Sequence, residues 1–314
     1  MKKRLENYLL KNFKNYWPDA DKVKNIKIEE FQSLDQHSFN YRIEITLLKD
    51  EKIIKEVLRA SQKVKFKIAS FLLKTKDSLP SFILYPLDFL KDEKIFLYRE
   101  IEGKPLRYFI LKKYPPKKLK ILVREVGIVL KLLHNFFKKY NFISSPSSPY
   151  IGSFEMLERY YPKWAAMAYD FKNEFKKKYQ KLSGKKQIIH GDFTPANIII
   201  QKDKELKIID FSSVRRGFFL EDIACFFAQL DDLYLWNYIS SSKKKNLQRE
   251  LLMGYFGKIP SKNILKKINF LKSSYLLTIL QLEFYPEVLL QNMGSKEKKV
   301  IEGFLRLIYD SLNV

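Results

Sequence analysis

The stretch His190-Gly-Asp-Phe-Thr-Pro-Ala-Asn197, followed by Ile208-Ile-Asp210-Phe211, decides how this 314-residue chain folds. Apolar runs lie before its first part, between the two parts and into the second, which is typical of short buried strands. Residues 202–204 are polar and mark a turn. The pattern predicts a loop, a strand, a turn and a second strand, and it brings three polar side chains to neighbouring strand ends. These side chains are Asp192, Asn197 and Asp210.

Phosphoryl transfer from a magnesium nucleotide needs this set of side chains. A carboxylate at Asp192 would orient the attacking hydroxyl and accept its proton. Asn197 and Asp210 would hold magnesium, which prefers hard oxygen ligands and takes few of them from the protein. The alternative is a polar loop between two core strands, in which Asp and Asn only make turn hydrogen bonds. Because both parts of the motif occur together, we favour the functional interpretation.

The two parts resemble the catalytic and metal-binding loops of the aminoglycoside phosphotransferase and choline kinase family. Gly191 stands where protein kinases usually carry Arg, and Ser212 replaces the Gly of their D-F-G. Both differences favour the small-molecule branch. The resemblance implies a two-lobed, protein-kinase-like α+β fold. Residues 1–102 would form a small lobe with an antiparallel β-sheet, and residues 103–314 would form a larger, mainly helical lobe.

The same resemblance implies ATP and Mg²⁺ as cofactors, with MgATP between the lobes. The γ-phosphate would pass to a hydroxyl group of a small-molecule acceptor, such as a sugar, an amino alcohol or an aminoglycoside-like compound. His190 would brace the catalytic loop. Asp222, in an Asp-Ile-Ala that resembles an Asp-Leu-Ala of the family, would be a helix N-cap or a buried partner of the loop backbone. We expect a structural role for His134, because a single His on an apolar helix face is usually a satisfied core residue.

The nucleotide-binding residues depart from the family pattern. The bend that would cover the phosphates resembles the family only near Ser38 and Asn40, and it has no glycine to let backbone amides approach closely. Arg59 stands in the place of the phosphate-binding Lys, and a guanidinium can grip phosphate oxygens in a bidentate way. The following helix, 62–74, has no Glu to pair with it. Glu100 and Ile101 begin a segment that resembles the hinge, where backbone groups meet adenine.

The remaining elements follow from periodicity. Residues 2–17 have apolar side chains at three- and four-residue spacing, which predicts an amphipathic helix that packs on the first lobe, with a membrane-surface helix as the alternative. Strands are expected over 27–31, 40–47, 53–58, 82–88 and 95–101, and long helices over 119–137, 154–182, 264–280 and 300–312. The acceptor would bind among the last helices. Candidate contacts there are Arg215, Arg216, Asp231, Asp232, Glu283 and Glu287, although solvated helix faces explain the acids equally well.

Composition narrows the class of protein. Hydrophobic residues make up 46% of the chain, which excludes a disordered protein. The single cysteine, Cys225, allows no internal disulfide and suggests a reducing compartment, and no apolar stretch reaches the roughly 20 residues of a membrane span. We therefore expect a cytoplasmic protein without a transmembrane segment, for which peripheral membrane contact stays open. The net charge of +24 is spread almost evenly along the chain, so we expect no nucleic-acid partner.

Two other classes of function remain open at this stage. A nucleotide-binding scaffold without transferase activity would explain the missing loop glycines, the missing helix Glu and Arg59, but not the intact Asp192, Asn197 and Asp210. A kinase acting on a lipid head group or a protein would keep the same catalytic residues. A basic surface-binding protein on the same fold would show binding that weakens steeply with salt.

Overall fold

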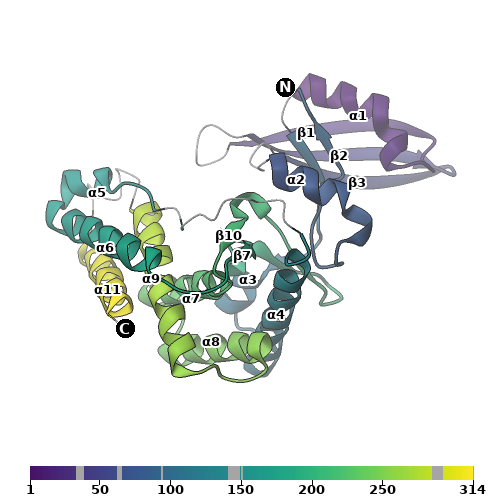
Figure 1. Cartoon of the computed structure of the whole chain (residues 1–314). Helices are drawn as coiled ribbons and strands as arrows, with labels where there is room; N and C mark the ends of the chain where they lie inside the picture. Colours follow the sequence, from purple (N-terminus) through teal and green to yellow (C-terminus); the bar gives the residue numbers. More distant parts are fainter. Residues whose placement is uncertain are drawn as a thin grey trace. The chain divides into compact units, whose positions relative to one another are not determined.

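The structure is a computed structural model that describes residues 1–32, 39–61, 66–92, 95–140, 149, 151–284 and 293–313. The chain divides into two compact units. The first comprises residues 1–103 and 201–212, and the second comprises residues 104–200 and 213–314. Figure 1 labels the helices and some of the strands of both units.

The first unit contains α1 (Lys2–Tyr16), β1 (Lys22–Gln32), β2 (Phe39–Lys49), β3 (Lys52–Ser61), α2 (Phe66–Lys74), β4 (Asp88–Leu90), β5 (Ile95–Arg99) and β9 (Leu206–Ile208). Strands β1 to β5 form an antiparallel sheet in the order β1-β2-β3-β5-β4. Asp50 and Glu51 both have positive φ and connect β2 to β3 in a two-residue loop, whose twist matches that of the strands. The five-stranded antiparallel sheet expected from the sequence is therefore confirmed.

Helix α1 packs on one face of this sheet. Its Leu5 and Leu9 are fully buried against alternate residues of the strands, including Ile43, Ile45 and Leu58. Two tyrosines of α1, Tyr8 and Tyr16, donate hydrogen bonds to Asp88 at the start of β4. The predicted packing of the first helix on the sheet is therefore confirmed.

Two predicted elements differ from the structure. Of the expected strand 82–88, only Asp88 belongs to β4, and Ile83 forms a single parallel bridge with Ile208. The apolar residues here fill the core without pairing in a ladder, and periodicity does not separate these two outcomes. The expected helix 154–182 is two helices, because Pro162 lacks the N–H that a continuous helix would need.

The second unit is mainly helical. Its helices are α3 (Leu106–Leu111), α4 (Pro116–Phe137), α5 (Glu155–Tyr160), α6 (Pro162–Gln180), α7 (Leu220–Leu235), α8 (Ser241–Phe256), α9 (Lys262–Glu283) and α11 (Ser295–Leu312). Its short strands are β6 (Lys104–Pro105), β7 (Gln187–Ile189), β8 (Ile198–Ile200) and β10 (Arg215–Gly217). Helices α6 and α11 lie side by side, as do α4 and α8 (Figure 1).

Helices α4 and α8 approach one another through two glycines. A side chain at Gly127 would meet the backbone of Leu251 and Tyr255, and one at Gly254 would meet the carbonyl of Arg124. The absence of a Cβ at both positions allows the two backbones to come into contact. This contact fixes α4, and with it His134, against the rest of the unit.

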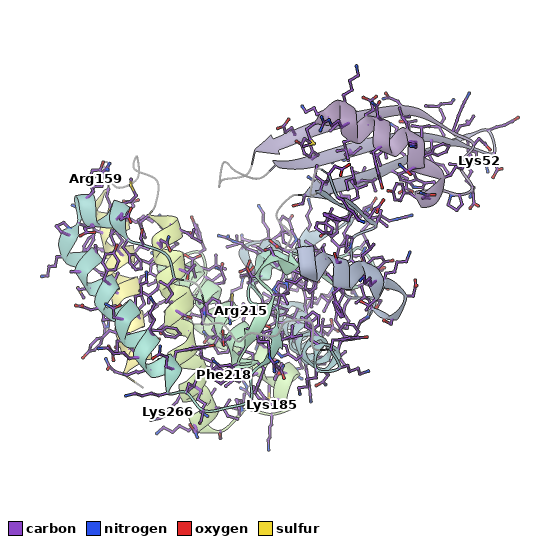
Figure 2. All side chains as sticks on the ribbon, turned by 45° about the horizontal axis from the view of Figure 1, so that its top comes forward. Lys52, Arg159, Lys185, Arg215, Phe218 and Lys266 are labelled. Atoms are coloured by element: carbon purple, nitrogen blue, oxygen red, sulfur yellow. The ribbon has the colours of Figure 1, made fainter. Side chains whose placement is uncertain are left out.

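Basic side chains are distributed over the surface. Figure 2 shows Arg159 at one end of the second unit, with Lys185 and Lys266 at another, and Lys52 belongs to the first unit. Arg215, in contrast, lies inside the second unit. Among the described residues, none of the helices has the length and continuous hydrophobicity that a membrane crossing requires.

Candidate functional site

The catalytic loop predicted from the sequence lies between β7 and β8 of the second unit. Ile188 and Ile189 of β7 are buried, and the ring of Phe193 anchors the middle of the loop in the core. Pro195–Asn197 forms one 3₁₀ turn that leads into β8. The apolar residues of the motif thus hold the loop, and its polar residues remain for chemistry.

The loop brings Asp192 and Asn197 into direct contact. The Asn197 amide nitrogen donates to the Asp192 carboxylate oxygen Oδ2 at 2.8 Å and to its backbone carbonyl at 2.9 Å. Because both donors of this amide are directed at Asp192, the amide oxygen points away from it. That oxygen is the atom type that magnesium prefers, so Asn197 fits a metal-binding role.

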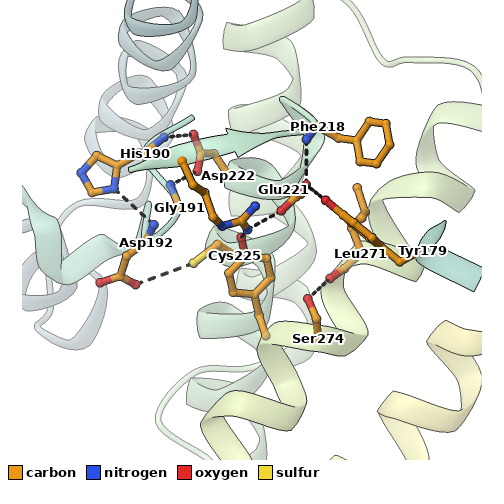
Figure 3. A network of polar contacts seen from close by, with 12 residues as sticks. Tyr179, His190, Gly191, Asp192, Phe218, Glu221, Asp222, Cys225, Leu271 and Ser274 are labelled. Atoms are coloured by element: carbon orange, nitrogen blue, oxygen red, sulfur yellow. Dashed lines mark hydrogen bonds and ion pairs between the residues drawn. The ribbon is translucent and has the colours of Figure 1, made fainter. Parts of the chain in front are cut away.

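Asp222 of α7 holds the start of this loop. Its carboxylate accepts hydrogen bonds from the backbone N–H groups of His190, at 2.9 Å, and Gly191, at 2.8 Å (Figure 3). Phe219 is the N-cap of α7, so of the two roles considered for Asp222 the structure shows the contact with the loop backbone. Gly191 has φ +81°, and a Cβ there would meet the carbonyl of Ser213. Both facts favour glycine at this position.

His134 of α4 lies behind Asp222. The histidine Nε2 is 2.8 Å from the Asp222 carboxylate, and Nδ1 is 2.8 Å from the Tyr255 hydroxyl. Since a carboxylate only accepts, Nε2 carries the proton. Burial alone would raise the pKa of Asp222, but the hydrogen bond and charge of His134, the charge of His190 and the hydrogen bond from the Gly191 N–H together lower the pKa. Asp222 is therefore ionised and able to bind the loop amides.

His190 contacts the backbone of Asp192, and Cys225 contacts its carboxylate. The His190 side chain is fully buried, and its Nδ1 accepts from the backbone N–H of Asp192 at 3.3 Å (Figure 3). The Cys225 sulfur is 4.0 Å from Asp192 Oδ1. Burial, followed by the charge of Asp192, raises the pKa of the thiol well above its usual value. The thiol is therefore protonated and contacts Asp192 as a weak donor.

Asp210 belongs to the first unit. Its backbone has φ +60°, which is uncommon for a residue other than glycine, and its Oδ1 accepts from the backbone N–H of Ser212 at 3.2 Å. The neighbouring Phe211 is buried. Burial, followed by the charge of Asp210, raises the pKa of Tyr98 on β5. The exposed Asp210 carboxylate thus lies near the polar face of the sheet, and its hard oxygens fit a metal ion.

Arg59 of β3 pairs with Glu100, just beyond β5. The Arg59 Nε is 2.8 Å from the Glu100 carboxylate. The helix segment after β3, residues 62–74, contains no Glu, and the pairing of Arg59 with Glu100 depends on the register between β3 and β5, which the local sequence does not reveal. The same carboxylate also accepts from Arg42 of β2 at 3.3 and 3.4 Å. Along β2, Arg42 alternates with the apolar residues Tyr41, Ile43 and Ile45. This alternation was the sequence signal that could have placed Arg42 on the polar face of the sheet.

The other predicted nucleotide contacts are only partly described. The backbone N–H of Glu100 donates to the carbonyl of Val57, and Ile101 is half-buried beyond the end of β5. Asn40 pairs with Phe31 and Ser61 across the strands, and its side chain lies outside the described part. Ser38 lies outside the described residues altogether.

Two of the acceptor-binding candidates have other partners. Arg215 is largely buried, with 12% of its side chain exposed, pairs with Glu221 and lies 3.2 Å from the Tyr275 hydroxyl, so it stabilises the interior (Figure 2). In the same network, Glu221 accepts from Tyr179 at 2.8 Å and from the Phe218 N–H at 2.7 Å (Figure 3). Asp231 is buried between Lys244, at 2.7 Å, and Lys272, at 2.6 Å. Glu287 lies outside the described residues.

Asp232 differs from Asp231 beside it. Its Oδ1 is buried and has no hydrogen-bond partner among the described residues. Burial, followed by the charge of Glu283, raises the pKa of Asp232 to about 7, with the charge of Arg107 opposing. An unpaired buried carboxylate oxygen is costly, so Asp232 suits a ligand that supplies a donor.

Comparison with known proteins adds independent information. Residues 95–241 match the profile described as "Phosphotransferase enzyme family". A search of curated protein sequences finds no significant match. Among solved structures, an amicoumacin kinase in complex with AMP-PNP, Ca²⁺ and Ami is similar, with a TM-score of 0.64 and 15% identity over 99% of this chain and 96% of that chain.

Two further structures show the same fold. The choline kinase LicA from Streptococcus pneumoniae has a TM-score of 0.54 and 12% identity, over 98% of this chain and 99% of that chain. A spectinomycin phosphotransferase in complex with ADP and spectinomycin has a TM-score of 0.54 and 11% identity, over 98% of both chains. These matches confirm the predicted α+β, kinase-like fold. The motifs, the fold and the profile over residues 95–241 thus agree with one another, and each is similar to what phosphotransferases show.

Proposed function

We propose that this protein transfers the γ-phosphate of MgATP to a hydroxyl group of a small molecule. The observation that carries the proposal is the contact between the Asp192 carboxylate and the Asn197 amide, on a loop that the buried Asp222 holds in place. A carboxylate fixed by neighbouring hydrogen bonds is suited to orient a hydroxyl group. The similar structures with AMP-PNP and ADP support a nucleotide as the phosphate donor.

Each residue has a distinct task in this reaction. Asp192 accepts a hydrogen bond from the acceptor hydroxyl and so orients the hydroxyl oxygen toward the phosphorus. It takes up the hydroxyl proton as transfer proceeds. Asn197 and Asp210 would supply oxygen ligands to Mg²⁺, and the ion neutralises phosphate charge when it is bound. Arg59 would contact the phosphates, the Glu100 side chain would hold Arg59, and the backbone groups of Glu100 and Ile101 would meet adenine. His190 and Asp222 act indirectly, by fixing the loop backbone.

The acceptor carries a basic nitrogen in this proposal. Cys225 and Asp232 are seven residues apart on α7, so both lie on the same face of the helix and are separated by about 10 Å along it. Cys225 contacts Asp192, so Asp232, whose Oδ1 has no hydrogen-bond partner among the described residues, lies along α7 from the proposed base. Glu283 adds a second negative charge near Asp232. An acceptor that contacts both carboxylates therefore has its hydroxyl and its nitrogen well separated.

The experiment is ADP release by the purified full chain, with MgATP and a panel of acceptors. We expect turnover with amino-substituted sugars or cyclitols, and little with ethanolamine or choline, whose nitrogen and oxygen are two carbons apart. Asp192→Asn should lower turnover by about 10²- to 10⁴-fold, the usual contribution of a positioned base. Asp310→Asn, on the exposed face of α11, is the matched control and should leave turnover unchanged.

Two outcomes would count against this account. Equal turnover of Asp192→Asn and the wild type would remove Asp192 from catalysis. Tight nucleotide binding without transfer to any acceptor, or to water, would favour the scaffold interpretation instead. Efficient phosphorylation of choline would agree with a phosphotransferase activity, but it would contradict the proposed separation between the hydroxyl and the nitrogen of the acceptor.

A further inference from the structure

One face of the sheet in the first unit carries a row of polar side chains. The register places Glu29, Arg42, Arg59 and Tyr98 opposite one another on β1, β2, β3 and β5. Residues opposite one another across adjacent strands project to the same face. The alternate residues, such as Ile43 and Leu58, are buried on the face that α1 covers. The row therefore lies on the face away from α1.

The two arginines of this row are direct neighbours across the strands. Arg42 and Arg59 oppose each other in the register of β2 and β3, and like charges in such positions destabilise a sheet. Glu100 compensates by accepting hydrogen bonds from both guanidinium groups, and Arg42 also pairs with Glu44. About half of the Arg59 side chain, 46%, remains exposed. The sheet thus keeps two neighbouring guanidinium groups that one carboxylate holds.

This pair of arginines lies close to the proposed metal ligand. Tyr98 is opposite Arg59, and the charge of Asp210 acts on the Tyr98 hydroxyl. In addition, the connection between β1 and β2 has no glycine in residues 33–38, so its sequence does not favour close approach of backbone amides to phosphate. Cationic side chains are the other means by which a protein binds phosphate oxygens.

We propose that Arg42 is a second phosphate-binding residue and that it acts with Arg59 on the polyphosphate of a nucleoside di- or triphosphate. The proposal rests on the proposed function. Arg42 contacts Glu100 through Nε and Nη2 and Glu44 through Nη1, and Arg59 contacts Glu100 through Nε and Nη2. Each Nη carries a second N–H, so the pair can also contact two successive phosphates. Glu100 is the positioning residue that holds both forks side by side before the nucleotide binds. The two arginines then share the phosphate contacts that backbone amides would otherwise provide.

The test is nucleotide affinity of the full chain, measured by titration calorimetry with MgATP, MgADP and AMP. Arg42→Gln should weaken MgATP at least about tenfold and weaken MgADP as well, because it removes hydrogen bonds to charged groups. AMP lacks the β- and γ-phosphates and should bind within twofold of the wild type. Arg42→Lys keeps the charge without the fork, so its MgATP affinity should lie between those of the wild type and Arg42→Gln.

Arg99→Gln is the matched control. Arg99 lies on β5 opposite Leu58, so it projects to the other face of the sheet, and 53% of its side chain is exposed. Its replacement should leave all three affinities unchanged. MgATP affinity of Arg42→Gln equal to that of the wild type would overturn the proposal, and an equal loss for AMP and MgATP would show a structural role for Arg42. If the wild type binds none of the nucleotides, the proposed function itself fails.

Discussion

At the scale of single residues, Asp232 has the most informative environment. Its folded-state pKa of about 7 is above the ordinary value for Asp, because burial and the charge of Glu283 disfavour ionisation. Between about pH 4 and pH 7 the folded chain therefore holds a proton that the unfolded chain has lost. The stability that the raised pKa of Asp232 contributes is fully present below about pH 4. It is lost as the pH rises from about 4 through 7.

The prediction for Asp232→Asn follows from this sign. The free energy of unfolding of the variant minus that of the wild type should be about 2 to 3 kcal/mol larger at pH 8 than at pH 5. Urea unfolding at both pH values measures the change, with the exposed Asp310→Asn as the control. A difference between variant and wild type that does not depend on pH would contradict the raised pKa of Asp232.

The sequence predicted the residues of the catalytic loop better than their supporting contacts. Asp192 and Asn197 lie in one loop, so their spacing alone indicated that they would be neighbours. The bonds from Asp222 to the loop, and from His134 to Asp222, join residues 32 and 88 positions apart. The resemblance had suggested the contact of Asp222 with the loop backbone as one of two roles, whereas the bond from His134 to Asp222 was not expected. Glu100 was expected at the hinge, and its role as the partner of Arg59 arises only from strand register.

At the scale of elements, the contact between α4 and α8 depends on glycine. A Cβ at Gly254 would meet the Arg124 carbonyl and the Gly127 backbone, and neither can move without shifting a helix. Because neither Gly127 nor Gly254 has a Cβ, the two backbones contact each other at these positions. The long helix 119–137 was predicted from its periodicity, but its partner was not.

Gly254→Ala should destabilise the protein by about 3 kcal/mol, at the upper end of overpacking costs. Gly294→Ala is the control, because the nearest atom to its added Cβ is a flexible Glu297 oxygen at 3.0 Å, and we expect a cost below about 1 kcal/mol. Denaturant midpoints of the two variants give the comparison. Equal midpoints would show that α4 and α8 can separate at little cost.

Errors in predicting elements had local causes. The strand expected over 82–88 is mostly irregular, since its apolar residues satisfy the core without a ladder. The helix expected over 154–182 breaks at Pro162, because a proline disfavours the helical backbone conformation of the residue before it. Periodicity identifies a buried face, but it does not by itself give the boundaries of an element.

At the scale of the whole molecule, fold and chemistry were predictable because one motif fixes both. The kinase-like α+β fold is confirmed, and residues 95–241 match the phosphotransferase profile. The net charge of +24 indicated little about function, and basic side chains are spread over both units (Figure 2). The sequence did not distinguish Asp231 from Asp232, because only the folded chain shows that two lysines pair with Asp231 while Asp232 Oδ1 has no hydrogen-bond partner among the described residues.

The most direct test of the central claim is thermal stability with ATP, comparing magnesium with EDTA, for the wild type and Asp210→Asn. A ligand at about 100 times its dissociation constant stabilises a fold by about 2.7 kcal/mol, which shifts the melting temperature by several degrees. We expect a magnesium-dependent rise in the wild type and in the exposed control Asp203→Asn, and its loss in Asp210→Asn. No rise in the wild type at millimolar ATP, or an equal rise in Asp210→Asn, would contradict a MgATP site that uses Asp210.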